Sequence, residues 1–213
     1  ANQATALREF ETLAGALERA GVTVHIFDDT PEPHTPDAIF PNNWVSFHPD
    51  GTVILYPMMA ANRRHERRHD VIEALKKDFV VKEIVDLSSY EDRNRFLEGT
   101  GSIVFDHKNR IAYACISPRT DVELLAEVCR ILKYQPVVFA AADRGAKPIY
   151  HTNVMMCVGN GFSVICLESI TDAKERDMVR GKLEEGGHDV IPITISQMNH
   201  FAGNMLAVRG ERK

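Results

Sequence analysis

Three short segments of the sequence place polar side chains directly after or inside apolar, strand-like runs. They are residues 37–44 (Asp-Ala-Ile-Phe-Pro-Asn-Asn-Trp), 97–102 (Leu-Glu-Gly-Thr-Gly-Ser) and 151–153 (His-Thr-Asn). A fold can hold such side chains rigidly at the mouth of a pocket. A carboxylate, an imidazole and several amides that converge from separate strands are the groups that chemistry on a guanidine or a urea needs. The sequence therefore predicts a site for a planar carbon–nitrogen group.

A guanidinium is stabilised by delocalisation, so attack at its carbon requires that the leaving nitrogen be protonated as the adduct collapses. His151 suits this acid/base task because its unperturbed pKa lies near neutrality. Glu98 can hydrogen-bond two nitrogens and keep the plane oriented. If residues 153–158 continue a strand from His151, then His151 and Asn153 point to the same face. Arg63 and Arg119 suit a bidentate grip on a carboxylate.

None of the four cysteines lies in a setting that favours a reactive thiolate. Cys115, Cys157 and Cys166 lie in strand-like apolar runs, and Cys129 lies on the apolar face of a helical pattern. There is no C-x-x-C pair, which argues against a zinc ribbon or a dithiol redox site. We expect buried thiols in a protein of the reducing cytoplasm, and we expect the nucleophile to lie elsewhere.

The composition is that of a globular domain with an apolar core. The chain has 213 residues, is 44% hydrophobic and 26% charged, and carries a net charge of −5. Nothing indicates a basic nucleic-acid surface, and no apolar run is long enough for a membrane span or marks a signal peptide. Because the sequence opens with Ala inside a helical pattern, we expect it to be an excerpt.

The elements that must position the site repeat along the chain. A helix and then a strand recur, and two strand-like runs precede each helix after the first, so the unit is strand, strand, helix, strand, about every 55 residues. Repetition of such units around a centre removes exposed sheet edges. A capping box of Thr120 and Glu123 is expected to begin the third helix. The helices are predicted at 5–19, 66–78, 121–133 and 172–185, and the strands that follow them at 22–27, 79–85, 136–140 and 189–193. The paired runs are 44–47 with 52–56, 102–105 with 111–116, and 153–158 with 162–167.

These segments resemble the guanidino-group-modifying enzymes of the pentein superfamily, which include arginine deiminase, dimethylarginine dimethylaminohydrolase and the amidinotransferases. The resemblance covers essentially the whole chain and is greatest to the amidinotransferase-like, or citrulline-utilisation hydrolase, subgroup. It implies a five-bladed α/β propeller of ββαβ units, with residues 1–213 forming one catalytic domain that lacks its N-terminal start. It also implies that a Gly-rich segment with the nucleophilic cysteine follows Lys213.

The resemblance assigns the amino-acid end of the substrate to three residues. Asp37 opens the segment that matches the family's Asp-x-Val-Phe-x-Glu-Asp string, and it would hold the α-amino group. Arg63 matches the first residue of Arg-Arg-Lys-Glu, and Arg119 matches the arginine of Lys-Arg-Thr-Asn. Both arginines would grip the substrate carboxylate.

The resemblance assigns the planar group to residues of all three segments. Glu98 matches the carboxylate of Leu-Asp-Gly-Gly-Asp, and His151 matches the catalytic histidine. Asn42, Asn43 and Asn153 stand where family members usually have carboxylates. Amides both donate and accept hydrogen bonds, so they suit a neutral ureido group. We therefore expect a substrate less cationic than arginine, with citrulline as the leading example.

Each of these residues also has a structural explanation, such as turn chemistry for the asparagines and Glu98, but their joint order favours a site. The prediction is a cytoplasmic, cysteine-dependent hydrolase that cleaves a C–N bond of a guanidino or ureido amino acid through a covalent thiol intermediate. It would use no metal or cofactor and bind neither nucleic acid nor membrane. An amidinotransferase, a pocket that binds without reacting, and a homo-oligomer stay open.

One motif supports a different chemistry. Residues 65–69, His-Glu-Arg-Arg-His, satisfy the H-E-x-x-H pattern of zinc hydrolases. On one helix His65 and His69 would share a face, and Glu66 could act as a base. The arginines at positions 63, 64, 67 and 68 oppose a dication, so a charged, solvated helix start is the simpler interpretation.

Overall fold

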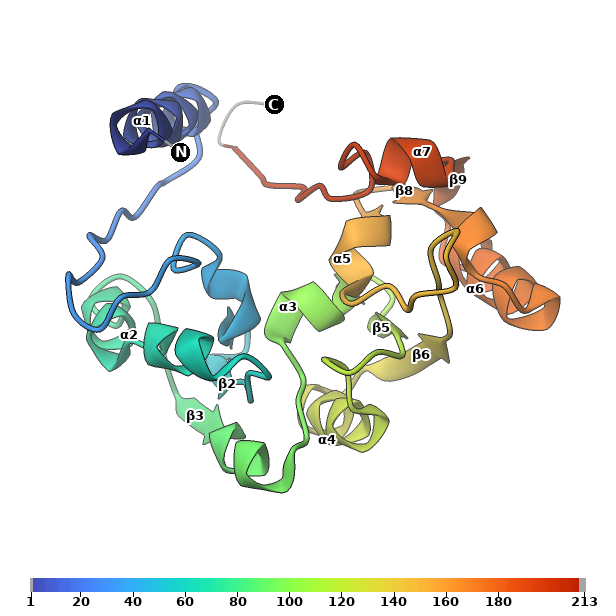
Figure 1. The fold of residues 1–213 in the computed structure, drawn as a ribbon, viewed down its shortest axis with the longest axis horizontal. Helices are drawn as coiled ribbons and strands as arrows, with labels where there is room; N and C mark the ends of the chain where they lie inside the picture. The colour runs from blue at the N-terminus through green and yellow to red at the C-terminus, as the bar shows by residue number, and fades with distance from the viewer. Residues whose placement is uncertain (1, 211–213) are drawn as a thin grey trace. The chain divides into compact units, whose positions relative to one another are not determined.

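Figure 1 shows the fold in a computed structural model, which describes residues 2–210. The chain divides into two compact units. One unit comprises Ala1–Asp29 with Ala207–Lys213, and the other comprises Thr30–Leu206. The three segments with the predicted site residues all belong to the second unit.

The first unit contains α1 (Gln3–Arg19), which is capped by the side chain of Asn2 and followed by Gly21 with a φ of 82°. The helix predicted at 5–19 is confirmed. The strand predicted at 22–27 is wrong, because no sheet among the described residues includes it. An extended segment becomes a strand only when a neighbouring strand pairs with its backbone.

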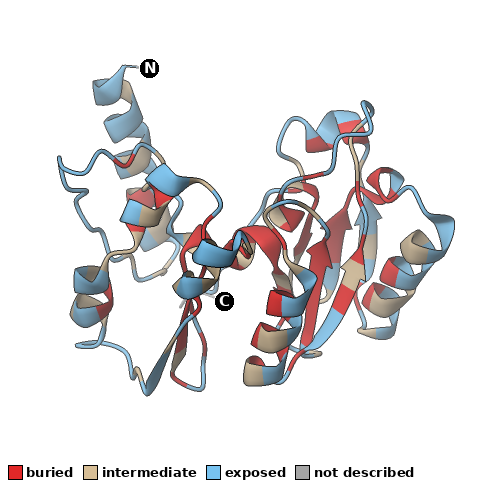
Figure 2. Ribbon diagram, turned by 60° about the horizontal axis from the view of Figure 1, so that its bottom comes forward, coloured by how far each residue is buried: buried red, intermediate tan, exposed pale blue. Residues whose placement is uncertain are grey.

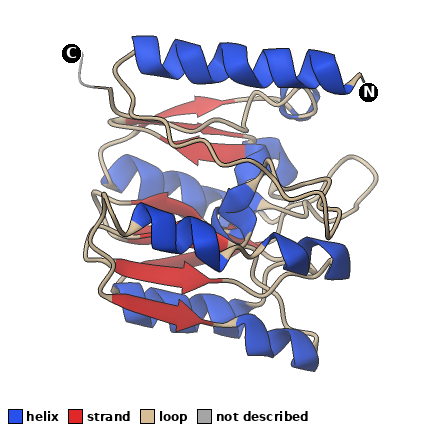
Figure 3. Ribbon diagram, turned by 90° about the vertical axis from the view of Figure 1, so that its left-hand side faces the viewer, coloured by secondary structure: helices blue, strands red, loops and turns tan. Residues whose placement is uncertain are grey.

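The second unit consists of repeated ββαβ blades, three of them within the described residues. In each blade the first two strands are antiparallel, and the third strand is parallel to the second and joined to it through a helix. Figure 3 shows the strands in small separate sets flanked by helices. The predicted α/β fold is thereby confirmed. The strands are β1 (Val45–Phe47), β2 (Thr52–Leu55), β3 (Glu83–Asp86), β4 (Val104–Asp106), β5 (Ile111–Cys115), β6 (Gln135–Phe139), β7 (Met156–Val158), β8 (Phe162–Ile165) and β9 (Asp189–Pro192). The helices are α2 (His69–Leu75), α4 (Val122–Leu132) and α6 (Ala173–Glu185), with η3 (Ser88–Arg93), η4 (Leu167–Ser169) and α7 (Ile195–Met198) in the connections.

Helix α4 shows how the sequence builds a blade. Its apolar residues recur with helical spacing, and that face packs against its own sheet while the opposite face stays in solvent (Figure 2). The N-cap is Asp121, whose side chain accepts from the Leu124 N–H, so the capping box predicted for Thr120 and Glu123 is wrong. Lys133 ends the helix with a φ of 60°. The buried face consists of Leu124, Leu125, Val128, Cys129 and Leu132.

The helix predicted at 66–78 is shorter than expected. Residues 61–66 form a separate 3₁₀ helix, η2 (Ala61–Glu66), and Arg67 is extended before α2 begins. The Arg67 side chain donates to the Tyr56 carbonyl and to Glu91, which holds the chain in this extended turn. The strand predicted at 79–85 is displaced accordingly and is paired only at β3.

A short helix precedes the first strand of every described blade. These helices are η1 (Pro41–Asn43), α3 (Gly99–Ser102) and α5 (Thr152–Met155), and α3 packs against both of the others. The strands predicted to begin at residues 102 and 153 therefore begin later. His151 and Asn153 do not lie on one strand, because the chain turns into α5 between them.

At the opposite end of the strands, a buried polar cluster joins the second and third described blades. Asp106 Oδ2 lies 2.6 Å from His188 Nε2, and both side chains are buried. Asn109 Nδ2 donates to Asp106 and to the Gly186 carbonyl of the next blade. Burial alone would raise the pKa of Asp106, but the hydrogen bonds from Asn109 and His188 hold it below its ordinary value.

Asp106→Asn should lower the free energy of unfolding at neutral pH by about 2–3 kcal/mol, because His188 loses a charged hydrogen-bond acceptor in the core. The folded-state pKa of Asp106 is depressed, so its contribution is present above pH 3.8 and is lost as the pH falls through the folded-state pKa. Urea denaturation at several pH values tests this. Asp70→Asn, which removes an exposed partner of Arg68, is the control and should change stability much less, because solvent screens an exposed ion pair.

Candidate active site

Glu98, which caps α3, lies at the centre of the predicted residues and is 0% exposed. Its Oε2 lies 2.7 Å from His151 Nε2 and 3.2 Å from Arg119 Nη1. Its Oε1 accepts from the Met59 N–H at 3.0 Å. The Glu98 carboxylate thus joins residues from all three described blades. The structure brings Glu98, His151 and Arg119 together, as the sequence predicts.

The Glu98 carboxylate fixes the tautomer of the His151 imidazole. A carboxylate only accepts hydrogen bonds, so His151 Nε2 carries the proton and Nδ1 faces the remainder of the site. Burial alone would raise the pKa of Glu98, but the hydrogen bond from His151, the Met59 N–H and the Arg119 charge bring it below its ordinary value of 4.5. The pair can therefore orient His151 as a proton donor or acceptor through Nδ1.

Two buried hydroxyls hold the backbones that carry these side chains. Ser102 Oγ accepts from the Glu98 N–H at 3.0 Å and donates to the Arg119 carbonyl at 2.7 Å. Thr152 Oγ1 donates to the Ser102 carbonyl at 2.6 Å and accepts from the Cys115 N–H at 2.8 Å. Sequence reasoning did not identify these roles. Both residues stand inside the polar segments that it singled out, which is the only signal that marks them.

The glycines of the second segment allow its close approach to the other two. Gly99 has a φ of 45°, and a Cβ there would overlap with the Asn42 carbonyl oxygen. A Cβ on Gly101 would lie 2.5 Å from the Asn43 amide and 2.9 Å from His151 Nδ1. The Asn43 and His151 side chains therefore face each other across a position that only glycine leaves open.

Arg63 is buried and is bound within the protein. Its Nε and Nη2 donate to the two oxygens of Glu66 at 2.9 and 2.8 Å, and its Nε lies 3.9 Å from Asp37 Oδ2. Because Arg63 has only donors, the Asn43 amide oxygen is assigned to the side of Arg63, where it accepts from Nη1 at 2.5 Å. The structure thus brings Asp37, Arg63 and Asn43 together, while their roles toward a substrate stay predictions.

Asn42 and Asn153 are less constrained. The Asn42 carbonyl accepts from the Thr100 hydroxyl at 3.4 Å. Asn153 lies in the first turn of α5, and both asparagines are half-buried. Within residues 2–210 neither side chain has an assigned hydrogen-bond partner, so their predicted contacts with a substrate stay predictions.

The four thiols are poor candidates for a nucleophile. All of them are buried and unpaired. Burial raises the pKa of Cys115 and of Cys129 to about 11, and it also raises the pKa of Cys157 and of Cys166. Nucleophilic attack requires the thiolate, so each of these cysteines is suited to packing rather than to catalysis.

The zinc alternative loses its geometric basis. His65 lies in η2 and His69 begins α2, with Arg67 and Arg68 extended between them, so the histidines do not share one helix face. Glu66 is bound by Arg63 and is not placed to act as a base.

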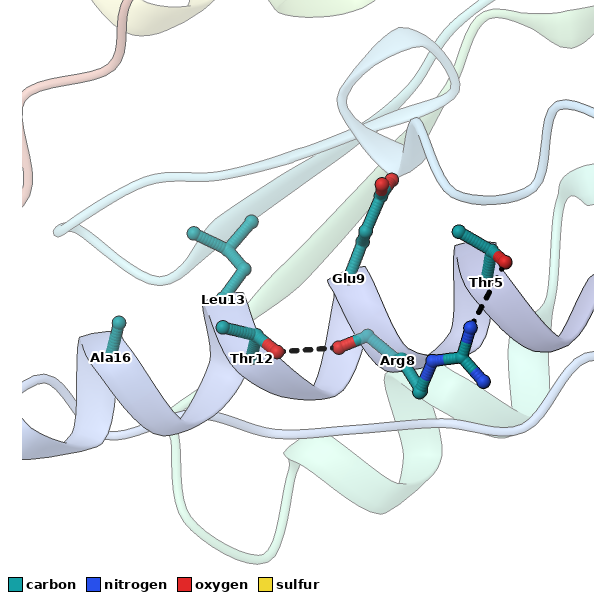
Figure 4. Close-up of a pocket in the computed structure, with 6 residues that line it drawn as sticks. All are labelled: Thr5, Arg8, Glu9, Thr12, Leu13 and Ala16. Carbon is teal, nitrogen blue, oxygen red and sulfur yellow. Dashed lines mark hydrogen bonds between the residues drawn. The ribbon is translucent and has the colours of Figure 1, made fainter.

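A separate hollow lies along α1 in the first unit (Figure 4). One helix face lines it, and Arg8 is bonded there to the Thr5 hydroxyl while Thr12 donates to the Arg8 carbonyl. It contains none of the predicted site residues. Its lining residues are Thr5, Arg8, Glu9, Thr12, Leu13 and Ala16.

Comparison with known families connects this geometry to a group of proteins. A family model described as N,N-dimethylarginine dimethylhydrolase, eukaryotic, matches residues 1–213. The chain belongs to this family. Dimethylarginine dimethylhydrolases are pentein enzymes that modify guanidino groups, so the resemblance drawn from the three polar segments is confirmed. A search of curated proteins gave no match to the chain.

Solved structures show the same fold at low sequence identity. The apo form of ArgZ, an arginine dihydrolase of the ornithine–ammonia cycle in cyanobacteria, has a TM-score of 0.75 and 17% identity over 97% of this chain, which spans 30% of that protein. The N-terminal domain of ArgZ, as a cysteine-to-serine variant bound to substrate, has a TM-score of 0.73 and 16% identity over 95% of this chain and 69% of that one. The dimethylarginine dimethylhydrolase of Pseudomonas aeruginosa, as a cysteine-to-serine variant complexed with citrulline, has a TM-score of 0.61 and 16% identity over 92% and 84%. Within residues 2–210, no helix has both the length and the apolar character that crossing a membrane requires.

Proposed function

We propose that this family member is a cysteine-dependent hydrolase that cleaves a C–N bond of a ureido or guanidino amino acid, with citrulline as the leading substrate. The observation that carries the proposal is the buried junction of Glu98, His151 and Arg119. It supplies an oriented imidazole, a carboxylate and a cation at one point. Family membership supports the same chemistry.

His151 would serve as general acid and base. In the first step His151 takes the thiol proton at Nδ1, the thiolate adds to the ureido carbon, and the imidazolium returns this proton to the amine as the C–N bond breaks, which releases ornithine and leaves an S-carbamoyl cysteine. A water molecule, deprotonated by His151 at Nδ1, then adds to the carbamoyl carbon, and the C–S bond breaks, which regenerates the thiolate and releases carbamic acid that decomposes to carbon dioxide and ammonia. A guanidino substrate would pass through an S-alkylthiouronium in the same site.

The nucleophile is proposed to be a cysteine that follows Lys213 in the full-length protein. The burial and the raised pKa of all four thiols in this chain support the proposal. The absence of a disulfide among these four cysteines supports a reducing, cytoplasmic location. Arg119 is proposed to bind the substrate carboxylate with the part of its guanidinium that Glu98 leaves open, and Asp37 to bind the amino group.

The decisive experiment is a product screen by mass spectrometry. Full-length protein is incubated separately with citrulline, arginine, dimethylarginine and agmatine, and His151→Ala serves as the control. We expect ornithine from citrulline and a loss of about 100-fold to 10,000-fold in the control. Turnover of arginine without turnover of citrulline would reject the proposed substrate. Turnover of none of the four by the wild-type protein would reject the proposed activity.

A further inference from the structure

Arg63 and Glu66 form a buried, hydrogen-bonded ion pair in the second unit. The Arg63 side chain is 7% exposed and that of Glu66 is 1% exposed. Two parallel hydrogen bonds join them, and Arg63 Nη2 also donates to the carbonyls of Asp37 and Phe40. Glu66 binds Nε and Nη2 of Arg63, and the remaining nitrogen, Nη1, points at the Asn43 amide.

The guanidinium decides which end of the Asn43 amide faces the site. Arg63 has only donors, so the Asn43 oxygen must turn toward it. The NH₂ group of Asn43 then lies on the side of Gly101 and His151. Asn43 is buried, which denies the amide a solvent partner in the reverse orientation. Asn43 therefore presents a hydrogen-bond donor, and not an acceptor, to the site.

We propose that Glu66, acting through Arg63, is a positioning residue that locks Asn43 with its NH₂ group toward the substrate and thereby selects a ureido carbonyl over a guanidinium. This inference rests on the proposed function. A guanidinium has donors only, so it would meet the Asn43 donor without a hydrogen bond, whereas the C=O of a ureido group accepts one. One unsatisfied buried donor corresponds to a discrimination of about 10-fold to 100-fold.

The family resemblance predicts a different role for Arg63, which is to grip the substrate carboxylate. The two roles differ in a measurable way. A carboxylate grip affects only substrates that have a carboxylate, whereas an oriented Asn43 affects every ureido substrate. Citrulline and arginine can therefore be compared with N-carbamoylputrescine and agmatine, which carry the same planar groups without the carboxylate.

The test measures kcat and KM of the full-length protein for these four compounds. Glu66→Gln loosens Arg63, and Asn43→Asp places a carboxylate oxygen on the substrate side. Both should lower the preference for ureido over guanidino substrates by at least about 10-fold, and by the same factor with and without the carboxylate. Glu91→Gln, which removes a buried carboxylate that binds Arg67 and the Met58 N–H, is the matched control and should leave this preference unchanged. A loss confined to citrulline and arginine would overturn the proposal in favour of the carboxylate grip.

A second readout separates this inference from the proposed function. The side-chain amide signals of Asn43 are assigned in the NMR spectrum of the unliganded protein by their loss in Asn43→Asp. In Glu66→Gln they should shift and exchange faster with water, and in Glu91→Gln they should not change. Unchanged signals in Glu66→Gln would overturn the positioning role, whether or not the protein turns over any substrate. If Glu66→Gln does not fold, the substrate preference of Asn43→Asp decides, and an unaltered preference rejects the inference.

Discussion

Glu98→Gln should lower kcat about 1,000-fold, because the neutral amide no longer fixes the Nε2 proton of His151 or balances Arg119. KM should change much less, since the amide keeps the shape of the side chain. Steady-state kinetics on the full-length protein with the substrate found in the product screen measures both values. This is the largest effect that we expect from a single isosteric change.

Glu91→Gln is the matched control for this variant. Glu91 is also a buried carboxylate that accepts from a backbone N–H, that of Met58, and it binds Arg67 in place of His151. Its replacement should reduce stability to a similar extent while kcat is preserved. Equal losses of kcat in the two variants would show that Glu98 acts through the fold and not through His151.

The effect of Glu98→Gln on the free energy of unfolding should depend on pH. The folded-state pKa of Glu98 is depressed below 4.5, so the carboxylate stabilises the fold above that pH and ceases to do so as the pH falls through the folded-state pKa. The difference in unfolding free energy between wild type and Glu98→Gln should be about 3 kcal/mol at neutral pH and should shrink under acid conditions. Denaturant titrations at pH 7 and at successively lower pH values measure this difference.

Gly101→Ala should reduce turnover by at least 100-fold, because the added methyl group would lie 2.5 Å from the Asn43 amide and 2.9 Å from His151 Nδ1. One of these two side chains must move, and either displacement separates the imidazole from the amide. We expect a folded protein with a modest loss of stability of about 1–3 kcal/mol. Kinetics and thermal denaturation of the full-length variant test the two parts separately.

Gly181→Ala provides the comparison. This glycine lies inside α6, and a Cβ there meets no atom within 4 Å. The substitution should raise stability by about 0.5–1 kcal/mol and leave kcat unchanged, since alanine is the better helix former. Normal activity in Gly101→Ala would contradict the close approach of Asn43 and His151.

The blade pattern could be predicted because it rests on periodicity. The apolar spacing of α4 and the short apolar runs at β4 and β5 are local signals that each extend over a whole element. The one-turn helices could not be predicted in this way. A helix of four residues such as α5 is too short to show a period, so the sequence predicts a strand over residues 153–158 where the structure has a helical turn up to Met155.

The proximity of Glu98, His151 and Arg119 was predictable from the sequence, but the hydrogen bonds among them were not. Glu98 and His151 are far apart in sequence, and only the packing of α3 against α5 decides that one oxygen of Glu98 meets Nε2. The pairing of Glu66 with Arg63 was also hidden, because Glu66 completes a zinc-like pattern in the sequence. Its partner Arg63 was assigned to the substrate, and the burial that pairs the two exists only in the folded chain.

The short helices η1, α3 and α5 lie outside the strand pairing, which begins at Val45, Val104 and Met156. The hydrogen bonds between strands therefore do not depend on which polar side chain each short helix carries. An exchange of an amide, a carboxylate or an imidazole in one turn leaves the register of every sheet intact. Divergence from a common ancestor can therefore proceed one blade at a time, with new substrates acquired on an inherited scaffold.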